Sequence, residues 1–189
     1  MTTLTALQTD QAGQATPILE QVKDQMGMVP NIFATMAHSP AALEGFLAFS
    51  GALAGGSLTP QFREQIALTI AGINSCDYCA SAHAVLGKGA GLDDEEVKLS
   101  LAGVASDEKK SAVLKFVAEV VSRQGRIDKN EVHTLRVHGF SDAEIVEILA
   151  NIGLNIFANY FNHVVDTDID FPFVSSNPLN QPTQSEKIA

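Results

Sequence analysis

Two cysteines, a histidine and a glutamate stand at spacings that could support thiol chemistry. Cys76 and Cys79 form a C-x-x-C pair and are the only cysteines of the chain. His83 follows Cys79 by four residues, so on a helix the imidazole lies one turn away on the same face. Glu64 precedes Cys76 by twelve residues. Because an imidazole can accept a thiol proton and a carboxylate can orient that imidazole, these residues suit a redox-active dithiol with its own proton relay.

A break in the helical pattern decides whether these residues can meet. Residues 71–75 contain a helix-weakening glycine and two good N-cap residues, so we expect one helix to end near Ile73 and the next to start just after Ser75. In one straight helix Glu64 and His83 would lie about 28 Å apart. An antiparallel αα-hairpin brings them level. It also places both cysteines in a first helical turn, where free N–H groups and the helix dipole stabilise a thiolate.

Inert cysteines and a zinc site are the other interpretations of this cluster. Free cysteines are often buried in cores, but a C-x-x-C followed by a helical histidine favours redox or nucleophilic use. Cys76, Cys79, His83 and Glu64 could ligate zinc, yet a structural zinc site usually has a second Cys or His pair. A glutamate in a first helical turn usually faces solvent, which is the simplest alternative for Glu64. We expect neither a metal nor a cofactor.

This pattern resembles the core motif of the alkylhydroperoxidase D-like proteins in the carboxymuconolactone decarboxylase superfamily. The motif is a Glu, twelve residues to the first Cys, and then C-x-x-C-x-x-x-H, and it is matched by Glu64, Cys76, Cys79 and His83. Residues 29–31, 36–40, 157–166 and 170–172 resemble its peroxidase-related branch, so the resemblance covers roughly residues 20–175. It implies an all-α fold that oligomerises and a thiol peroxidase in which the Cys next to the His attacks the peroxide. Tyr78 stands where some members carry a second His.

The mechanism that we expect is a cysteine redox cycle. Cys79 attacks a hydroperoxide and becomes a sulfenic acid, Cys76 condenses with it to a disulfide, and an external dithiol reduces the pair. Glu64 holds or relays the proton of His83. In the competing assignment Cys76 is the nucleophile, because the first Cys of a C-x-x-C lies nearer the helix end.

Two other function classes stay open. The first is a decarboxylase or lactone-handling enzyme of the same superfamily, which would use His83 and Glu64 without needing the cysteines. The second is a non-enzymatic redox-sensing or metal-binding module whose oligomeric state changes with the dithiol.

Composition limits the partners and the compartment. The net charge of −10, without any basic run, argues against nucleic acid and against an anionic membrane surface. Apolar residues make up 46% and charged residues only 18% of the chain, which suggests an apolar surface covered in a homo-oligomer such as a dimer, trimer or hexamer. Neither a signal peptide nor a transmembrane span is visible. Together with the C-x-x-C pair, this indicates a reducing cytoplasm.

The fold class that we predict is all-α, because no segment alternates with period two between turn signals. We expect an N-terminal arm over residues 1–15, one helical domain over 16–174 and a tail over 175–189. Start signals predict the helices: Pro17, Thr59-Pro60, Ser106, and the capping boxes of Asp93 with Glu96, Asp128 with Glu131 and Ser141 with Glu144.

An offset of 83 residues superimposes Glu64 on Glu147, Cys76 on Asn159, Cys79 on Asn162 and His83 on Asp166. We interpret this as a degenerate second copy of the helical unit that packs against the first and closes the site. The aromatic residues of that second copy are then candidates for a pocket wall: Phe157, Tyr160 and Phe161.

Overall fold

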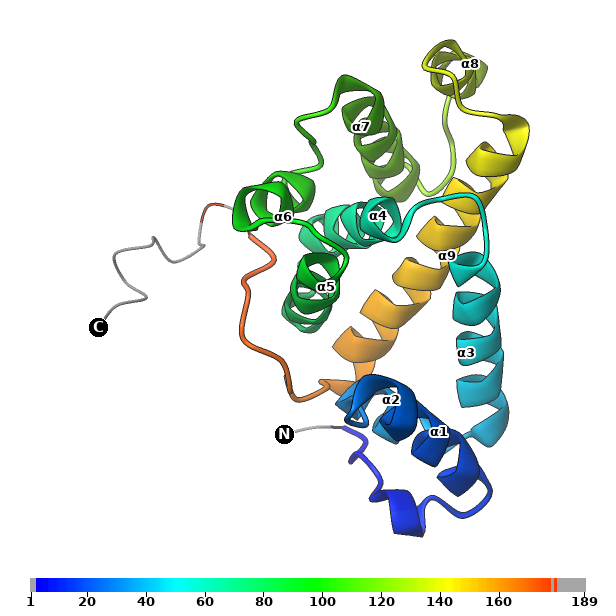
Figure 1. Ribbon diagram of the computed structural model, residues 1–189, viewed down its shortest axis with the longest axis vertical. Coiled ribbons are helices and arrows are strands. Elements are labelled where there is room, and N and C mark those ends of the chain that lie inside the picture. Colours follow the sequence, from blue (N-terminus) through cyan, green and yellow to red (C-terminus); the bar gives the residue numbers. More distant parts are fainter. Residues whose placement is uncertain (1–2, 178, 180–189) are drawn as a thin grey trace.

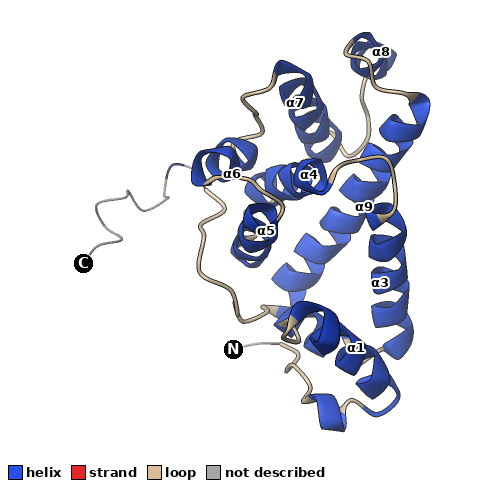
Figure 2. Ribbon diagram, in the orientation of Figure 1, coloured by secondary structure: helices blue, strands red, loops and turns tan. Residues whose placement is uncertain are grey.

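The computed structural model describes residues 3–177 and 179, and their regular secondary structure consists of helices joined by loops, with no β-strand (Figures 1 and 2). The prediction of an all-α fold is therefore confirmed. The elements are the 3-10 helices η1 (Thr9–Gln11) and η2 (Gly13–Ala15) and the α-helices α1 (Thr16–Met26), α2 (Asn31–Met36), α3 (Pro40–Ala54), α4 (Pro60–Ile73), α5 (Asp77–Gly89), α6 (Asp94–Leu101), α7 (Glu108–Ser122), α8 (Lys129–Val137) and α9 (Asp142–Val165).

Side-chain caps set most helix starts where the sequence predicts them. The Thr59 hydroxyl accepts a hydrogen bond from the Phe62 N–H, with Pro60 in the first turn of α4. All three predicted capping boxes, which open α6, α8 and α9, are present. One start is corrected: Asp107, not Ser106, caps α7, because its carboxylate accepts from the Lys110 N–H.

Helix α4 runs through the middle of the fold and packs against α5, α6, α7 and α9 (Figure 1). One core cluster joins Leu68 and Ala71 to α1, α3 and α5, and the other joins Ile66 and Ile70 to α7, α8 and α9. Every residue of α4 from 65 to 71 is buried, so this part of the helix is covered on all sides rather than along one stripe. The helix that carries Glu64 is thus held firmly in place.

A glycine lets α4 and α6 approach each other closely. A Cβ atom at Gly72 would lie 2.2 Å from the Leu101 carbonyl oxygen. Beside it, the Thr69 hydroxyl donates to the Ser100 carbonyl at 2.8 Å. Only glycine fits this crossing without moving one helix.

Helix α9 is one unbroken helix of 24 residues, whereas the first copy of the proposed repeat is broken between Ile73 and Asp77. The repeat interpretation therefore stays a prediction. The chain leaves α9 through Asp166 in a left-handed conformation (φ 53°), and residues 167–177 then run as a strap past the start of α5 (Figure 1). At the other end of the chain, the Thr3 N–H donates to the Val165 carbonyl at 2.9 Å. No helix in the described ranges is long and apolar enough to cross a membrane.

Candidate active site

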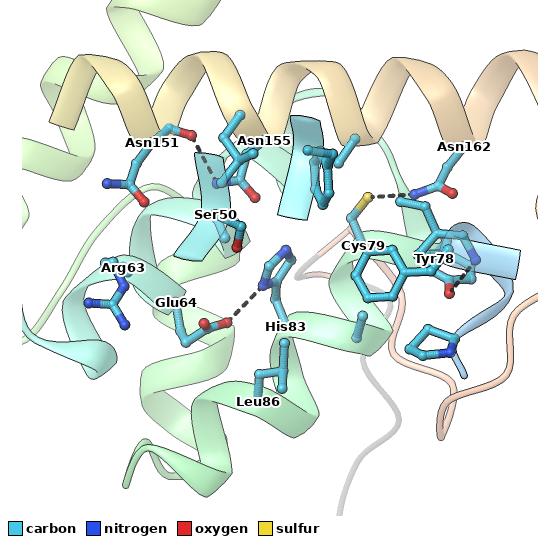
Figure 3. Close-up of a pocket in the computed structure, with 18 of the residues that line it drawn as sticks. Ser50, Arg63, Glu64, Tyr78, Cys79, His83, Leu86, Asn151, Asn155 and Asn162 are labelled. Carbon is cyan, nitrogen blue, oxygen red and sulfur yellow. Dashed lines mark hydrogen bonds and ion pairs between the residues drawn. The ribbon is translucent and has the colours of Figure 1, made fainter. Parts of the chain in front are cut away.

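The turn between α4 and α5 brings Glu64 and His83 together. Glu64 Oε2 lies 2.7 Å from His83 Nδ1, and the two side chains are 19% and 21% exposed (Figure 3). Glu64 lies ten residues before Asn74 and His83 nine residues after it, so consecutive helices that double back at this break bring them level. Glu64 therefore faces the imidazole and not solvent.

The surroundings of His83 favour the imidazolium. Burial lowers its pKa, but the Glu64 carboxylate and, less strongly, Cys76 and a hydrogen bond to the Asn155 side chain raise it by more. The net effect raises the pKa of His83 above the usual histidine value. The residue is thus poised to carry a proton that it can give to a reacting group.

The two thiols lie at the N-terminus of α5, and both are buried, with 2% of each residue exposed. Cys76 is the N-cap residue: its sulfur accepts from the Cys79 N–H at 3.4 Å, and the two sulfur atoms lie 2.7 Å apart. The hydrogen bond between the two sulfurs, together with the Cys79 N–H and His83, lowers the pKa of Cys76 despite its burial. The same hydrogen bond and burial raise the pKa of Cys79. Of the two sulfurs, Cys76 is therefore the one on which the site favours the thiolate, and Cys79 is the one that holds its proton more tightly.

A row of asparagines on α9 covers the dithiol and the imidazole. Asn162 Nδ2 donates to the Cys79 sulfur at 3.3 Å, and Asn159 acts on the same sulfur; both lower the pKa of Cys79 against the larger effects above. Asn155 bonds to His83 and, through Nδ2, to the Asn151 carbonyl at 2.9 Å. All four asparagines are buried, although a helix face of this kind is usually apolar. Sequence reasoning missed them as site residues.

A cavity of about 200 Å³ opens onto Cys79 and His83 (Figure 3). Three of the α9 asparagines line one side of it, and Glu64 with Arg63 lines another. Most of the remaining wall is apolar, and the side chains that form it are Met26, Pro30, Ile32, Phe33, Phe46, Leu53, Leu86, Leu154 and Phe171. A small molecule with an apolar body fits such a wall. We call this space the apolar cavity.

Tyr78, the residue before Cys79, makes structural contacts. Its hydroxyl accepts a hydrogen bond from the Ile32 N–H at 3.2 Å, and its ring meets the edge of Phe171 with ring centroids 5.8 Å apart. Burial raises the pKa of Tyr78 far above the usual tyrosine value, so the hydroxyl stays neutral. Tyr78 thus ties α2 and the strap to the site.

The strap closes over the first turn of α5. The Ser176 N–H and hydroxyl both donate to Asp77 Oδ1, at 2.7 and 2.6 Å. The Val174 N–H donates to the Ser81 hydroxyl at 2.9 Å. Ser176 is buried, so chain beyond the predicted boundary at residue 174 lies against the domain. The remainder of the predicted tail, residue 178 and residues 180–189, lies outside the described residues.

The aromatic residues expected to form the pocket wall do not line the apolar cavity. Phe157 and Tyr160 are exposed, at 46% and 56%, and Phe161 packs on the edge of the core. The helical phase of α9 explains the difference, because its asparagines face inward and these rings lie on other faces. Among the described residues, no group of three or more His, Cys, Asp or Glu side chains is arranged to hold a metal ion.

Comparisons with known proteins concern the family and the fold of the chain. A model of the carboxymuconolactone decarboxylase family matches residues 40–122. The alkylhydroperoxidase AhpD core of an uncharacterized peroxidase-related protein from Ralstonia eutropha JMP134 is 25% identical, over 84% of this chain and 86% of that one, with a TM-score of 0.77. A putative antioxidant defence protein AhpD from Agrobacterium tumefaciens is 26% identical, over 71% and 94% of the two chains, with a TM-score of 0.65.

A third solved structure with a similar fold is that of a debrominase. The debrominase Bmp8 in complex with 2,3,4-tribromopyrrole is 21% identical, over 90% of this chain and 92% of that one, with a TM-score of 0.77. At this identity the likeness concerns the fold alone. A search of curated proteins finds no match.

Proposed function

Because the chain belongs to the alkylhydroperoxidase D-like and carboxymuconolactone decarboxylase superfamily, in its peroxidase-related branch, we propose that it is a thiol-dependent peroxidase. It would reduce hydroperoxides in antioxidant defence through the Cys76–Cys79 dithiol. The observation that carries the proposal is a pair of sulfur atoms 2.7 Å apart, one of them opening into a cavity that also holds the Glu64–His83 pair.

The oxidation step uses the protons of the resting site. Cys79 attacks the terminal oxygen of the hydroperoxide and passes its own proton to the Cys76 thiolate. The O–O bond breaks, Cys79 becomes a sulfenic acid, and the leaving alkoxide takes a proton from the His83 imidazolium. Cys76 then attacks the sulfenic sulfur, and its proton leaves with the hydroxyl group as water. The products are the disulfide, an alcohol and neutral His83, so charge and protons balance.

Access favours Cys79 as the attacking sulfur. Cys79 lines the apolar cavity together with His83, and Cys76 does not. The lower pKa of Cys76 supports the competing assignment, but in the proposed step it makes Cys76 the base for Cys79. Trapping of sulfenic acid in single variants tests the choice. We expect the adduct in Cys76→Ser, and an adduct in Cys79→Ser alone would reverse the assignment.

The cavity wall favours an organic hydroperoxide, since aromatic and aliphatic side chains can bury an alkyl body. The reductant would be an external dithiol, and the cycle needs a reducing compartment such as the cytoplasm. Neither a metal nor a cofactor takes part in the proposed steps.

The deciding experiment is thiol titration with mass spectrometry before and after one equivalent of an organic hydroperoxide. We expect loss of both thiols and a mass decrease of about 2 Da, as a disulfide requires. Two intact thiols would contradict the peroxidase. Turnover of a lactone or carboxylate substrate by a Cys76→Ser, Cys79→Ser double variant would instead support the decarboxylase-type alternative.

We also propose that a second copy of the chain covers the outer face of α9. Six exposed positions on this face follow helical spacing and carry no charge on a chain of net charge −10: Val146, Leu149, Gly153, Phe157, Tyr160 and Val164. They span about 27 Å of helix. Light scattering is expected to show a homo-oligomer that the double change Phe157→Glu, Val164→Glu dissociates. A wild-type monomer would contradict this.

A further inference from the structure

The two cysteines open toward different cavities. Cys79 lines the apolar cavity, whereas Cys76 lines a second cavity of about 250 Å³ between the start of α5 and the end of α9. Tyr78 and Asn162 line both cavities and form the wall between them. The other residues of the second space, which we call the polar cavity, are Ser75, Asp77, His163, Asp166, Thr167 and Ile169.

We propose that the polar cavity is the entry site for the thiol reductant, which attacks Cys76 while the hydroperoxide reaches Cys79 from the other side. This inference rests on the disulfide cycle proposed above. It gives the dithiol two separate faces, one for each half-reaction.

The chemistry of exchange agrees with attack at Cys76. The reductant thiolate forms a bond to the Cys76 sulfur, the bond between Cys76 and Cys79 breaks, and its electron pair leaves with Cys79. Asn162 Nδ2, 3.3 Å from the Cys79 sulfur, and Asn159 then stabilise the leaving thiolate. Thiol–disulfide exchange is faster when the leaving sulfur holds negative charge well. Attack at Cys79 would instead release Cys76, which the Cys79 N–H supports, so both sulfurs can leave and the choice between them rests on access: Cys76, not Cys79, lines the polar cavity.

The second thiol of the reductant completes the step. It attacks the reductant sulfur of the mixed disulfide, and Cys76 leaves as a thiolate that the Cys79 N–H supports at 3.4 Å. Of the two protons that the dithiol gives up, one returns to Cys79 and one to His83. The dithiol becomes a cyclic disulfide, and the site regains its resting protonation.

Charge around the polar cavity favours an uncharged dithiol. The residues that line it include Asp77 and Asp166 but no Lys or Arg, and the whole chain has a net charge of −10. A reductant with carboxylate groups would be repelled as it approaches. We therefore expect dithiothreitol to reduce the disulfide faster than dimercaptosuccinate, and more so at low salt.

Two bulky substitutions separate the half-reactions. Ile169 in the polar cavity and Leu86 in the apolar cavity are similarly exposed, at 37% and 39%, so tryptophan can narrow either opening without entering the core. Diamide forms the disulfide without peroxide, and its reduction by dithiothreitol is followed by free thiols. Ile169→Trp is expected to slow reduction by about 10-fold or more, because exchange depends on access to the attacked sulfur. Leu86→Trp is expected to slow oxidation by cumene hydroperoxide and to leave reduction unchanged.

Val137→Trp, at an exposed position of α8 outside both cavities, is the control for added bulk and is expected to change neither rate. The proposal would be overturned if the Ile169→Trp variant were reduced at the wild-type rate. It would also be overturned if Leu86→Trp slowed reduction as much as Ile169→Trp does. Failure of the peroxidase itself would appear only in the hydroperoxide arm, because the reduction arm starts from diamide-oxidised protein.

A second measurement needs no substitution. Oxidised protein is mixed with limiting 2-mercaptoethanol, and the thiol released in the exchange is alkylated at once. Peptide mapping is expected to find the mercaptoethanol adduct on Cys76 and the alkyl group on Cys79. The reverse distribution would place the entry site at the apolar cavity.

Discussion

Replacing Gly72 with alanine is expected to push α4 and α6 apart. The new Cβ would lie 2.2 Å from the Leu101 carbonyl oxygen, and ordinary contacts begin at 3.4 Å, so the helices must separate by about 1.2 Å. Overpacking costs about 1–3 kcal/mol, and we take the upper end because the obstructing atom belongs to a backbone. Alanine in place of glycine within a helix returns about 1 kcal/mol. The net loss of about 2 kcal/mol lowers Tm by about 4–8 °C in a domain of this size.

Thermal and urea unfolding followed by far-ultraviolet circular dichroism measures this loss at matched protein concentration. Gly45→Ala is the control, because Gly45 is an exposed residue within α3 and its Cβ would meet nothing within 4 Å. That variant is expected to gain up to about 1 kcal/mol from helix propensity. If Gly72→Ala were as stable as Gly45→Ala, α4 and α6 could not approach each other as closely as described, and the account of Gly72 would be wrong.

Three further changes test the site. Glu64→Gln removes the carboxylate that raises the pKa of His83, so the effect of burial then lowers that pKa. The rate of peroxide-driven thiol loss is measured against pH, and its alkaline limb is expected to move to lower pH. An unmoved limb would exclude His83 as the proton donor. Asn162→Leu removes a donor to the Cys79 sulfur and is expected to slow disulfide reduction by about 10-fold. The control is Thr69→Val, which removes buried hydrogen bonds outside both cavities and is expected to lower stability without changing the rate of reduction. Tyr78→Phe leaves the buried Ile32 N–H without a partner and is expected to lower the free energy of unfolding, measured in urea, by about 1–3 kcal/mol. An unchanged urea midpoint would show that water replaces the hydroxyl.

Local signals explain why the helices could be predicted. A cap such as Thr59 acts within three residues of itself, so sequence alone indicates where α4 begins. The neighbouring aspartate displaced Ser106 as the cap of α7 because both residues have suitable oxygens and only the backbone course selects one. The contact of Glu64 with His83 was predictable because a turn of few residues links their helices.

The contribution of α9 could not be predicted in the same way. Its asparagines recur at helical spacing, at positions 151, 155, 159 and 162, which was a usable signal. Polar residues on a helix usually face solvent, however, so their spacing alone does not indicate a buried row. The structure places the row inside, with Val146 and Val164 outside, and there Asn162 donates to the Cys79 sulfur. Only the tertiary arrangement brings the two residues together.

The strap and α9 give the order in which the site is completed during synthesis. Ser176 binds Asp77 across 99 residues of sequence, and Asn162 binds Cys79 across 83. At about 5–20 residues per second, the ribosome adds the strap some 5–20 s after the two cysteines. During that interval the nascent chain displays both thiols without the side chains that later enclose them. The thiols of a newborn molecule are therefore more accessible to oxidants than those of the finished fold, in which each cysteine is 2% exposed.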